Sequence, residues 1–163
     1  MNRRSILAGL AAASILPLAS TSTVLAQTRI EPSKLKALQG GDFSTASSKL
    51  ARSRSSNKMV RTFAALEITE QAAVAKAFGA RPGEAGIEAR HLAMLADLEA
   101  ARGDVFDRLY IQSQIKGHQE LLAIHQRYAR SGNDPMARGA SIVGVTGIES
   151  HLTMLKAMQG MLR

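Results

Sequence analysis

Successive stretches of this chain place apolar residues three or four positions apart, and short polar junctions separate the stretches. The spacing predicts helices over residues 42–54, 58–78, 87–102, 104–130 and 135–162. The junctions hold residues that begin helices: Asn57 and Asp134 are suited to N-caps, and Pro135 to a first helical position. Short connections between long amphipathic helices predict an all-α fold, an antiparallel four-helix bundle with an additional short helix.

Composition agrees with a helical domain and excludes several classes of site. The chain of 163 residues has no cysteine and no tryptophan, and 4% of its residues are aromatic. Helix-favouring residues dominate instead, which argues against a β-sandwich or a barrel. The absence of cysteine excludes a disulfide framework, a thiolate metal site, a cysteine nucleophile and a lipoprotein anchor.

The first 26 residues have the pattern of an export signal. Arg3 and Arg4 form a positively charged start, and Ile6–Leu18 is an apolar stretch shorter than a comfortable membrane span. Val24 and Ala26 are small enough to precede a signal-peptidase cut after residue 26. The arginine pair partly matches a twin-arginine signal, so both that route and the general secretory route remain open. We expect the mature protein in the periplasm or cell envelope, without a membrane span.

Residues 27–41 have weak periodicity and contain Pro32 and the pair Gly40–Gly41. This composition predicts a mobile lead-in. Asp42 is then placed to cap the first helix, and residues 42–163 are expected to form a single helical-bundle domain.

Without residues 1–26 the chain has 19 basic and 13 acidic residues, a net charge of +6, and most of this excess lies in one stretch without acidic residues. Its basic residues are Lys49, Arg52, Arg54, Lys58 and Arg61. Such a run can contact an anionic envelope surface, or it can be a solvated face beside a turn. Nucleic acid is not an expected partner, because an exported protein does not meet it and no aromatic residues interleave for base stacking.

Several polar side chains fall on the apolar faces of the predicted helices. In a helical projection of residues 58–78, Glu67 and Gln71 lie on the apolar centre line and Glu70 lies at its edge. Other helices place Asp107, Gln114, His118, His125 and His151 on their apolar faces. A carboxylate in such a position is costly unless it is paired, hydrogen-bonded, protonated or bound to a metal ion.

Some of these residues lie in segments that resemble a known family. The segments Phe63–Gln71, Val105–Ile111, Gly117–Leu122 and Glu149–Leu152 resemble the bacterial domain-of-unknown-function family 4142. Its members are secreted helical bundles similar to ferritin, often described as predicted outer-membrane proteins. The resemblance therefore implies a ferritin-like bundle. Many members carry an Asp-His pair where this chain has Glu70–Gln71.

Two interpretations of the polar residues follow. In the first, Glu67 and the histidines form a buried hydrogen-bonded network that fixes helix register in a structural or interaction module. In the second, Glu67, His118 and His151 are ligands for iron, manganese, zinc or copper. Additional ligands or outer partners would come from Glu70, Gln71, Asp107, Gln114 and His125.

Geometry distinguishes these interpretations. Ligand atoms about 2.0–2.2 Å from one common point favour a metal ion, whereas direct Glu67–His contacts near about 2.8 Å favour the network. A complete di-iron site is not expected, because Glu88 and His91 alone have the Glu-x-x-His spacing. No hydrolase or nucleotide-binding motif occurs, so we do not expect an enzyme.

Overall fold

The computed structural model describes residues 30–162, and the expected export signal lies outside them. The described part contains α1 (Pro32–Arg54), α2 (Lys58–Ala77), α3 (Ala89–Ala100), α4 (Gly103–Ser131) and α5 (Pro135–Met161). It contains no strand. Within residues 30–162, no helix combines the length and the apolar character that a membrane crossing requires.

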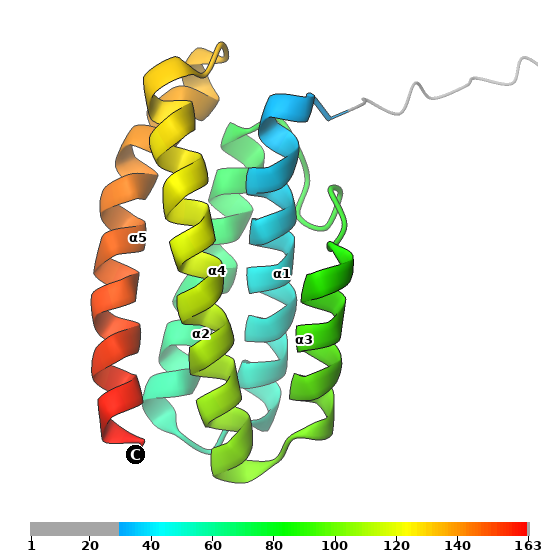
Figure 1. Ribbon diagram of the computed structural model, residues 1–163, viewed down its shortest axis with the longest axis vertical. Coiled ribbons are helices and arrows are strands. Elements are labelled where there is room, and N and C mark those ends of the chain that lie inside the picture. The colour runs from blue at the N-terminus through cyan, green and yellow to red at the C-terminus, as the bar shows by residue number, and fades with distance from the viewer. Residues whose placement is uncertain (1–29, 163) are drawn as a thin grey trace, which may run out of the picture.

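Helices α1, α2, α4 and α5 form a bundle in which neighbouring helices are antiparallel, and α3 packs outside it against α1 and α4 (Figure 1). Because α2 and α4 run in the same direction, the chain must return between them, and α3 makes this return. The predicted antiparallel four-helix bundle with one additional short helix is confirmed.

Two of the expected helix starts are confirmed in detail. The Asn57 side chain accepts hydrogen bonds from the backbone N–H groups of Met59 and Val60 at the start of α2. The Asp134 side chain does the same at α5, where Pro135 is the first helical residue. Asp134 also accepts a hydrogen bond of 2.6 Å from Lys34 Nζ, which ties the start of α1 to the start of α5 and raises the pKa of Lys34.

The expected mobile lead-in is wrong from Pro32 onward, because α1 begins there rather than at residue 42. Gly40 and Gly41 are packing positions inside the helix. A Cβ on Gly40 would lie 2.7 Å from Leu121 Cδ2, and one on Gly41 would lie 2.6 Å from Gln71 Oε1. The glycine pair therefore allows α1 to approach α2 and α4 closely. This close packing outweighs the low intrinsic helix propensity of glycine.

Asp42 is consequently not an N-cap. It lies in the middle of α1, and its carboxylate accepts hydrogen bonds from the backbone N–H groups of Gly83 at 2.6 Å and Ala85 at 3.0 Å. Both donors belong to the loop between α2 and α3. Asp42 thus anchors that loop to the bundle, and burial raises the pKa of its carboxyl group.

Replacing Gly40 by alanine should destabilise the protein by about 1–3 kcal/mol, because the new methyl group overpacks the contact with Leu121. Gly139→Ala is the matched control, since a Cβ at Gly139 meets nothing within 4 Å. We expect this control to be neutral or slightly stabilising. Urea unfolding of the two variants measures the difference, and equal midpoints would show that α1 does not pack this closely.

The apolar core of the bundle is divided along its length. One cluster surrounds Phe106 and Tyr110, near the start of α4, and a second surrounds Phe78 and Tyr128, near the ends of α2 and α4. A third, smaller cluster consists of Leu121, Ile148 and Leu152. Glu67 and His118 lie in the middle of α2 and α4, at the level between the first two clusters. The core therefore encloses a layer of polar side chains.

Candidate metal centre

Glu67 is the central residue of this polar layer. Its side chain is fully buried, because the apolar stripe of α2 on which it lies faces the bundle axis. Its Oε1 atom accepts hydrogen bonds from Ser44 Oγ at 2.7 Å and from Gln71 Nε2 at 2.8 Å. Its Oε2 atom is buried and accepts no hydrogen bond of acceptable geometry. One carboxylate oxygen is satisfied and the other is not.

The unsatisfied Oε2 atom forms a nearly equilateral triangle with two histidine nitrogens. It lies 3.3 Å from His118 Nε2 and 3.2 Å from His151 Nδ1. The two nitrogens are 3.3 Å apart. Three helices contribute to this triangle, which we call the Glu67–His118–His151 cluster. Within the described residues it is the one group of carboxylate and imidazole side chains with the proximity that a metal site needs.

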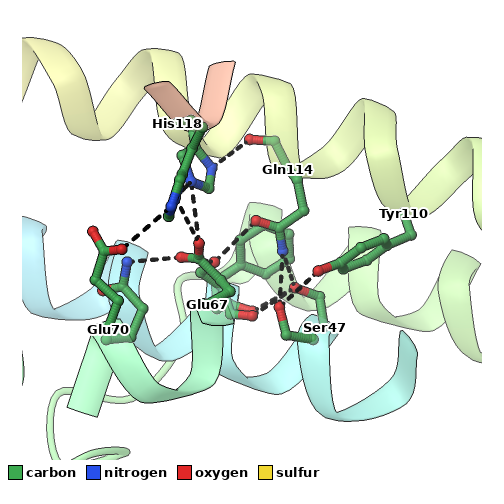
Figure 2. A network of polar contacts seen from close by, with 11 residues as sticks. Ser47, Glu67, Glu70, Tyr110, Gln114 and His118 are labelled. Atoms are coloured by element: carbon green, nitrogen blue, oxygen red, sulfur yellow. Dashed lines mark hydrogen bonds and ion pairs between the residues drawn. The ribbon is translucent and has the colours of Figure 1, made fainter. Parts of the chain in front are cut away.

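Contacts on the outer sides of the imidazole rings determine which nitrogen carries hydrogen in the neutral rings. His118 Nδ1 lies 2.8 Å from the backbone carbonyl oxygen of Gln114, which can only accept (Figure 2). His151 Nε2 lies 3.3 Å from Glu70 Oε2. Both outer nitrogens must therefore donate, and the nitrogens that face Glu67 carry lone pairs.

Three acceptor atoms consequently face one another in a buried site. This arrangement is unfavourable unless a cation lies among them. A proton on one ring satisfies one edge of the triangle, such as the 3.3 Å contact between the two histidines. A metal ion satisfies all three lone pairs at once. The arrangement of donors and acceptors can thus hold either a proton or a metal ion.

The size of the triangle agrees with a metal ion. A tetrahedral ion with bonds of about 2.0–2.1 Å has ligand atoms about 3.3–3.4 Å apart, close to the observed edges of 3.2–3.3 Å. Octahedral Mg²⁺-like coordination at about 2.1 Å would need ligand atoms about 3.0 Å apart. A point about 2.0–2.1 Å from all three atoms exists just outside their plane, as a metal ion requires. No Glu67–His contact approaches the distance of a direct charge-assisted hydrogen bond.

The electrostatics of the cluster favour an ionised carboxylate. Burial raises the pKa of Glu67, but the rings of His118 and His151 and the Ser44 hydroxyl outweigh burial and hold this pKa well below its usual range. The pKa of His151 is raised, chiefly by Glu67. An anionic oxygen in a dry site attracts positive charge, whether a proton or a metal ion supplies it.

A chain of hydrogen bonds surrounds the cluster on the α1 side. Ser44 Oγ lies 3.0 Å from Gln114 Oε1, and Gln114 Nε2 donates to Ser47 Oγ at 2.8 Å (Figure 2). Ser48 Oγ and Tyr110 Oη lie 2.9 Å apart at the end of this chain. These contacts hold Glu67 and the helical turn that carries His118 in place.

The serines of α1 are not among the site residues predicted from the sequence, although they lie in the helix predicted over residues 42–54. A signal for them exists. Ser44, Ser47 and Ser48 are spaced by three and four positions and share one face of a helix with Ala51, which is fully buried.

The other candidate residues divide into two groups. Glu70, Gln71 and Gln114 surround the cluster as hydrogen-bonding partners. Asp107 is buried, but it lies about three turns before His118 on α4 and does not join the cluster. His125 lies elsewhere as well, 3.1 Å from Ser141 Oγ and edge-on to Phe78. Helical phase predicts the correct face for these two residues but not their height along the bundle.

Two residues of the basic stretch make hydrogen bonds to other parts of the chain. Arg54 donates to the backbone carbonyl of Glu99 at 2.7 Å, near the end of α3. Arg61 donates to the carbonyls of Ser55 and Ser56 in the α1–α2 turn. Lys49, Arg52, Arg54 and Lys58 are exposed. A surface-binding role would therefore depend on these four residues.

Comparison with known proteins identifies a family for this chain. Searches of curated proteins and of solved structures gave no match. A family model described as Domain of unknown function (DUF4142) matches residues 33–158, which includes every residue of the Glu67–His118–His151 cluster and its partners. The chain therefore belongs to the DUF4142 family.

Proposed function

We propose that this protein is an exported helical bundle that binds one transition-metal ion through Glu67, His118 and His151. One observation carries the proposal: Glu67 Oε2, which has no hydrogen-bond partner, and one nitrogen of each histidine are buried and lie 3.2–3.3 Å from one another. Export is inferred from the pattern of residues 1–26.

Zinc is the ion that this donor set fits best. Two imidazole nitrogens and one carboxylate oxygen are common zinc ligands, and the triangle has the edge of a tetrahedral site. Mn²⁺ prefers octahedral oxygen-rich sites, and Cu²⁺ prefers tetragonal ones. Iron fits a facial triad of two histidines and one carboxylate, but its octahedral geometry would need the triangle to contract.

The metal content of the purified protein tests this proposal. The chain would be expressed with its own N-terminus and purified from the periplasm without chelator or affinity tag. Mass spectrometry of the metals should find close to one zinc ion per chain. His118→Ala should lose this metal, because it removes one of the three ligand atoms.

His125→Ala is the matched control for that variant. His125 is a buried histidine on the same helix, but it lies outside the cluster. We expect it to be destabilised without losing metal. Metal-free wild-type protein that also fails to take up zinc, iron, manganese or copper would overturn the proposal and leave the hydrogen-bonded network as the role of these residues.

A further inference from the structure

We propose that the metal ion keeps a fourth coordination position, which opens to solvent at the seam between α2 and α5 and takes a small exogenous ligand. Water is the resting ligand, and a small anion can replace it. This inference rests on the proposed metal site. It adds that the metal site has an open coordination position for an external ligand, unlike a structural site in which the protein supplies all four ligands.

Neighbouring polar groups are already engaged and cannot supply a fourth protein ligand. The Ser44 hydroxyl and the Gln71 amide N–H both donate to Glu67 Oε1. The side-chain amide of Gln114 is held by Ser44 and Ser47. Because three protein atoms are left for an ion that binds four, the last ligand must come from outside the protein.

An aromatic ring closes one side of the cluster. The Phe63 ring centroid lies 5.2 Å from that of His151 and 6.0 Å from that of His118. Phe63 is itself 1% exposed. It offers no donor atom, and it excludes water from its side of the cluster. The exogenous ligand must therefore approach from another direction.

Solvent approaches the cluster from the side of α2 and α5. The side chains of Glu67 and His118 are 0% and 2% exposed, whereas those of His151 and Glu70 are 11% and 36% exposed. Gly147 of α5 faces Glu70 here, and a Cβ on Gly147 would lie 3.2 Å from Glu70 Oε1. The absence of a side chain at Gly147 thus makes room for the Glu70 carboxylate at the partly exposed edge of the cluster.

Charge favours an oxygen or anionic ligand at this position. A divalent ion with Glu67 as its one carboxylate ligand leaves a positive charge inside the core. Glu70 offsets this charge from the rim, where it contacts the outer nitrogen of His151. Water that can ionise, or a small anion, balances the charge at the fourth position.

Cobalt(II) replaces zinc in such sites and makes the coordination visible by absorption spectroscopy. We expect Co²⁺ to bind one per chain with the intense visible bands of a four-coordinate ion, and His118→Ala to abolish them. Titration with sodium azide should then shift these bands with a saturable dependence on azide concentration. An unchanged spectrum of loaded protein at saturating azide would show that the site is closed and would overturn this inference alone. Failure of Co²⁺ to bind would overturn the metal site itself.

The route to the site has its own test. Gly147→Val places a branched side chain against Glu70, whereas Gly139→Val makes the same change on α5 where a Cβ meets nothing within 4 Å. Stopped-flow mixing of the cobalt-loaded fraction with azide measures association separately from loading. Association should be about tenfold slower in Gly147→Val and unchanged in Gly139→Val. Equal rates in both variants would show that ligand does not enter beside Gly147.

Discussion

Zinc should raise the unfolding temperature of the wild-type protein by about 10–20 °C and should leave that of Glu67→Gln unchanged. Binding to the folded state alone stabilises it by about 4 kcal/mol when free metal is about 1,000 times its dissociation constant. For a domain of this size, each kcal/mol shifts the midpoint by about 3–5 °C. Glu67→Gln keeps the shape of the side chain but replaces the anionic ligand with a neutral amide. Calorimetry of both proteins, with zinc and with chelator, gives four midpoints to compare.

The chelated samples separate the two interpretations of the cluster. With both histidines neutral in the metal-free protein, Glu67 Oε2 has no donor, so removing the charge of Glu67 should change the free energy of unfolding by less than about 1 kcal/mol. A network maintained by a protonated histidine predicts the opposite, because Glu67→Gln would then leave a buried imidazolium without its counter-ion. A loss above about 3 kcal/mol in chelator, together with no effect of zinc on the wild-type protein, would contradict the metal site.

Acid should destabilise the metal-free protein through His125. Burial lowers the pKa of His125 to about 4 in the folded state, whereas its unperturbed value is 6.5. Between these two values the unfolded chain binds a proton that the folded chain does not, so stability falls as pH falls from 6.5 towards 4. The loss amounts to about 3 kcal/mol over this interval, because each tenfold difference in proton affinity between the two states corresponds to about 1.4 kcal/mol.

His125→Gln should remove this dependence, because glutamine does not titrate. The measurement is the free energy of unfolding in urea at several pH values from about 4 to about 7, with chelator present throughout. Other groups titrate in the same range, so the difference in slope between the two proteins isolates His125. Parallel pH profiles would contradict a neutral buried His125.

The angular position of each residue around its helix axis is sufficient to predict that the three residues of the cluster face the core. A step of about 100° per residue places Glu67, His118 and His151 on the apolar faces of their helices, and the bundle brings these faces together. The same rule nominates Asp107 and His125, which the structure places at other heights along the bundle. Phase specifies the direction of a side chain from the helix axis, but the relative heights of helices depend on how their side chains pack.

The first helix shows the limit of local reasoning. Gly40 and Gly41 are poor helix formers, and the region around them has little amphipathic pattern, so local rules predict a mobile segment there. In the bundle their missing side chains make space for Leu121 and Gln71. Whether a glycine ends a helix or brings two helices together depends on the residues of other helices that pack against it. These residues lie far from the glycine in the sequence, so local rules do not take them into account.

By itself, the sequence determined the all-α class, the helix starts at Asn57 and Asp134, and which polar residues face the core. These properties depend on periodicity and on side chains that hydrogen-bond to adjacent backbone, both of which act over a few residues. The tertiary structure alone decided that Glu67 Oε2, His118 Nε2 and His151 Nδ1 lie 3.2–3.3 Å from one another and that Glu67 Oε2 is left without a hydrogen-bond partner. That outcome depends on the close approach of separate helices and on outer partners such as Glu70, and contacts between segments distant in sequence determine both.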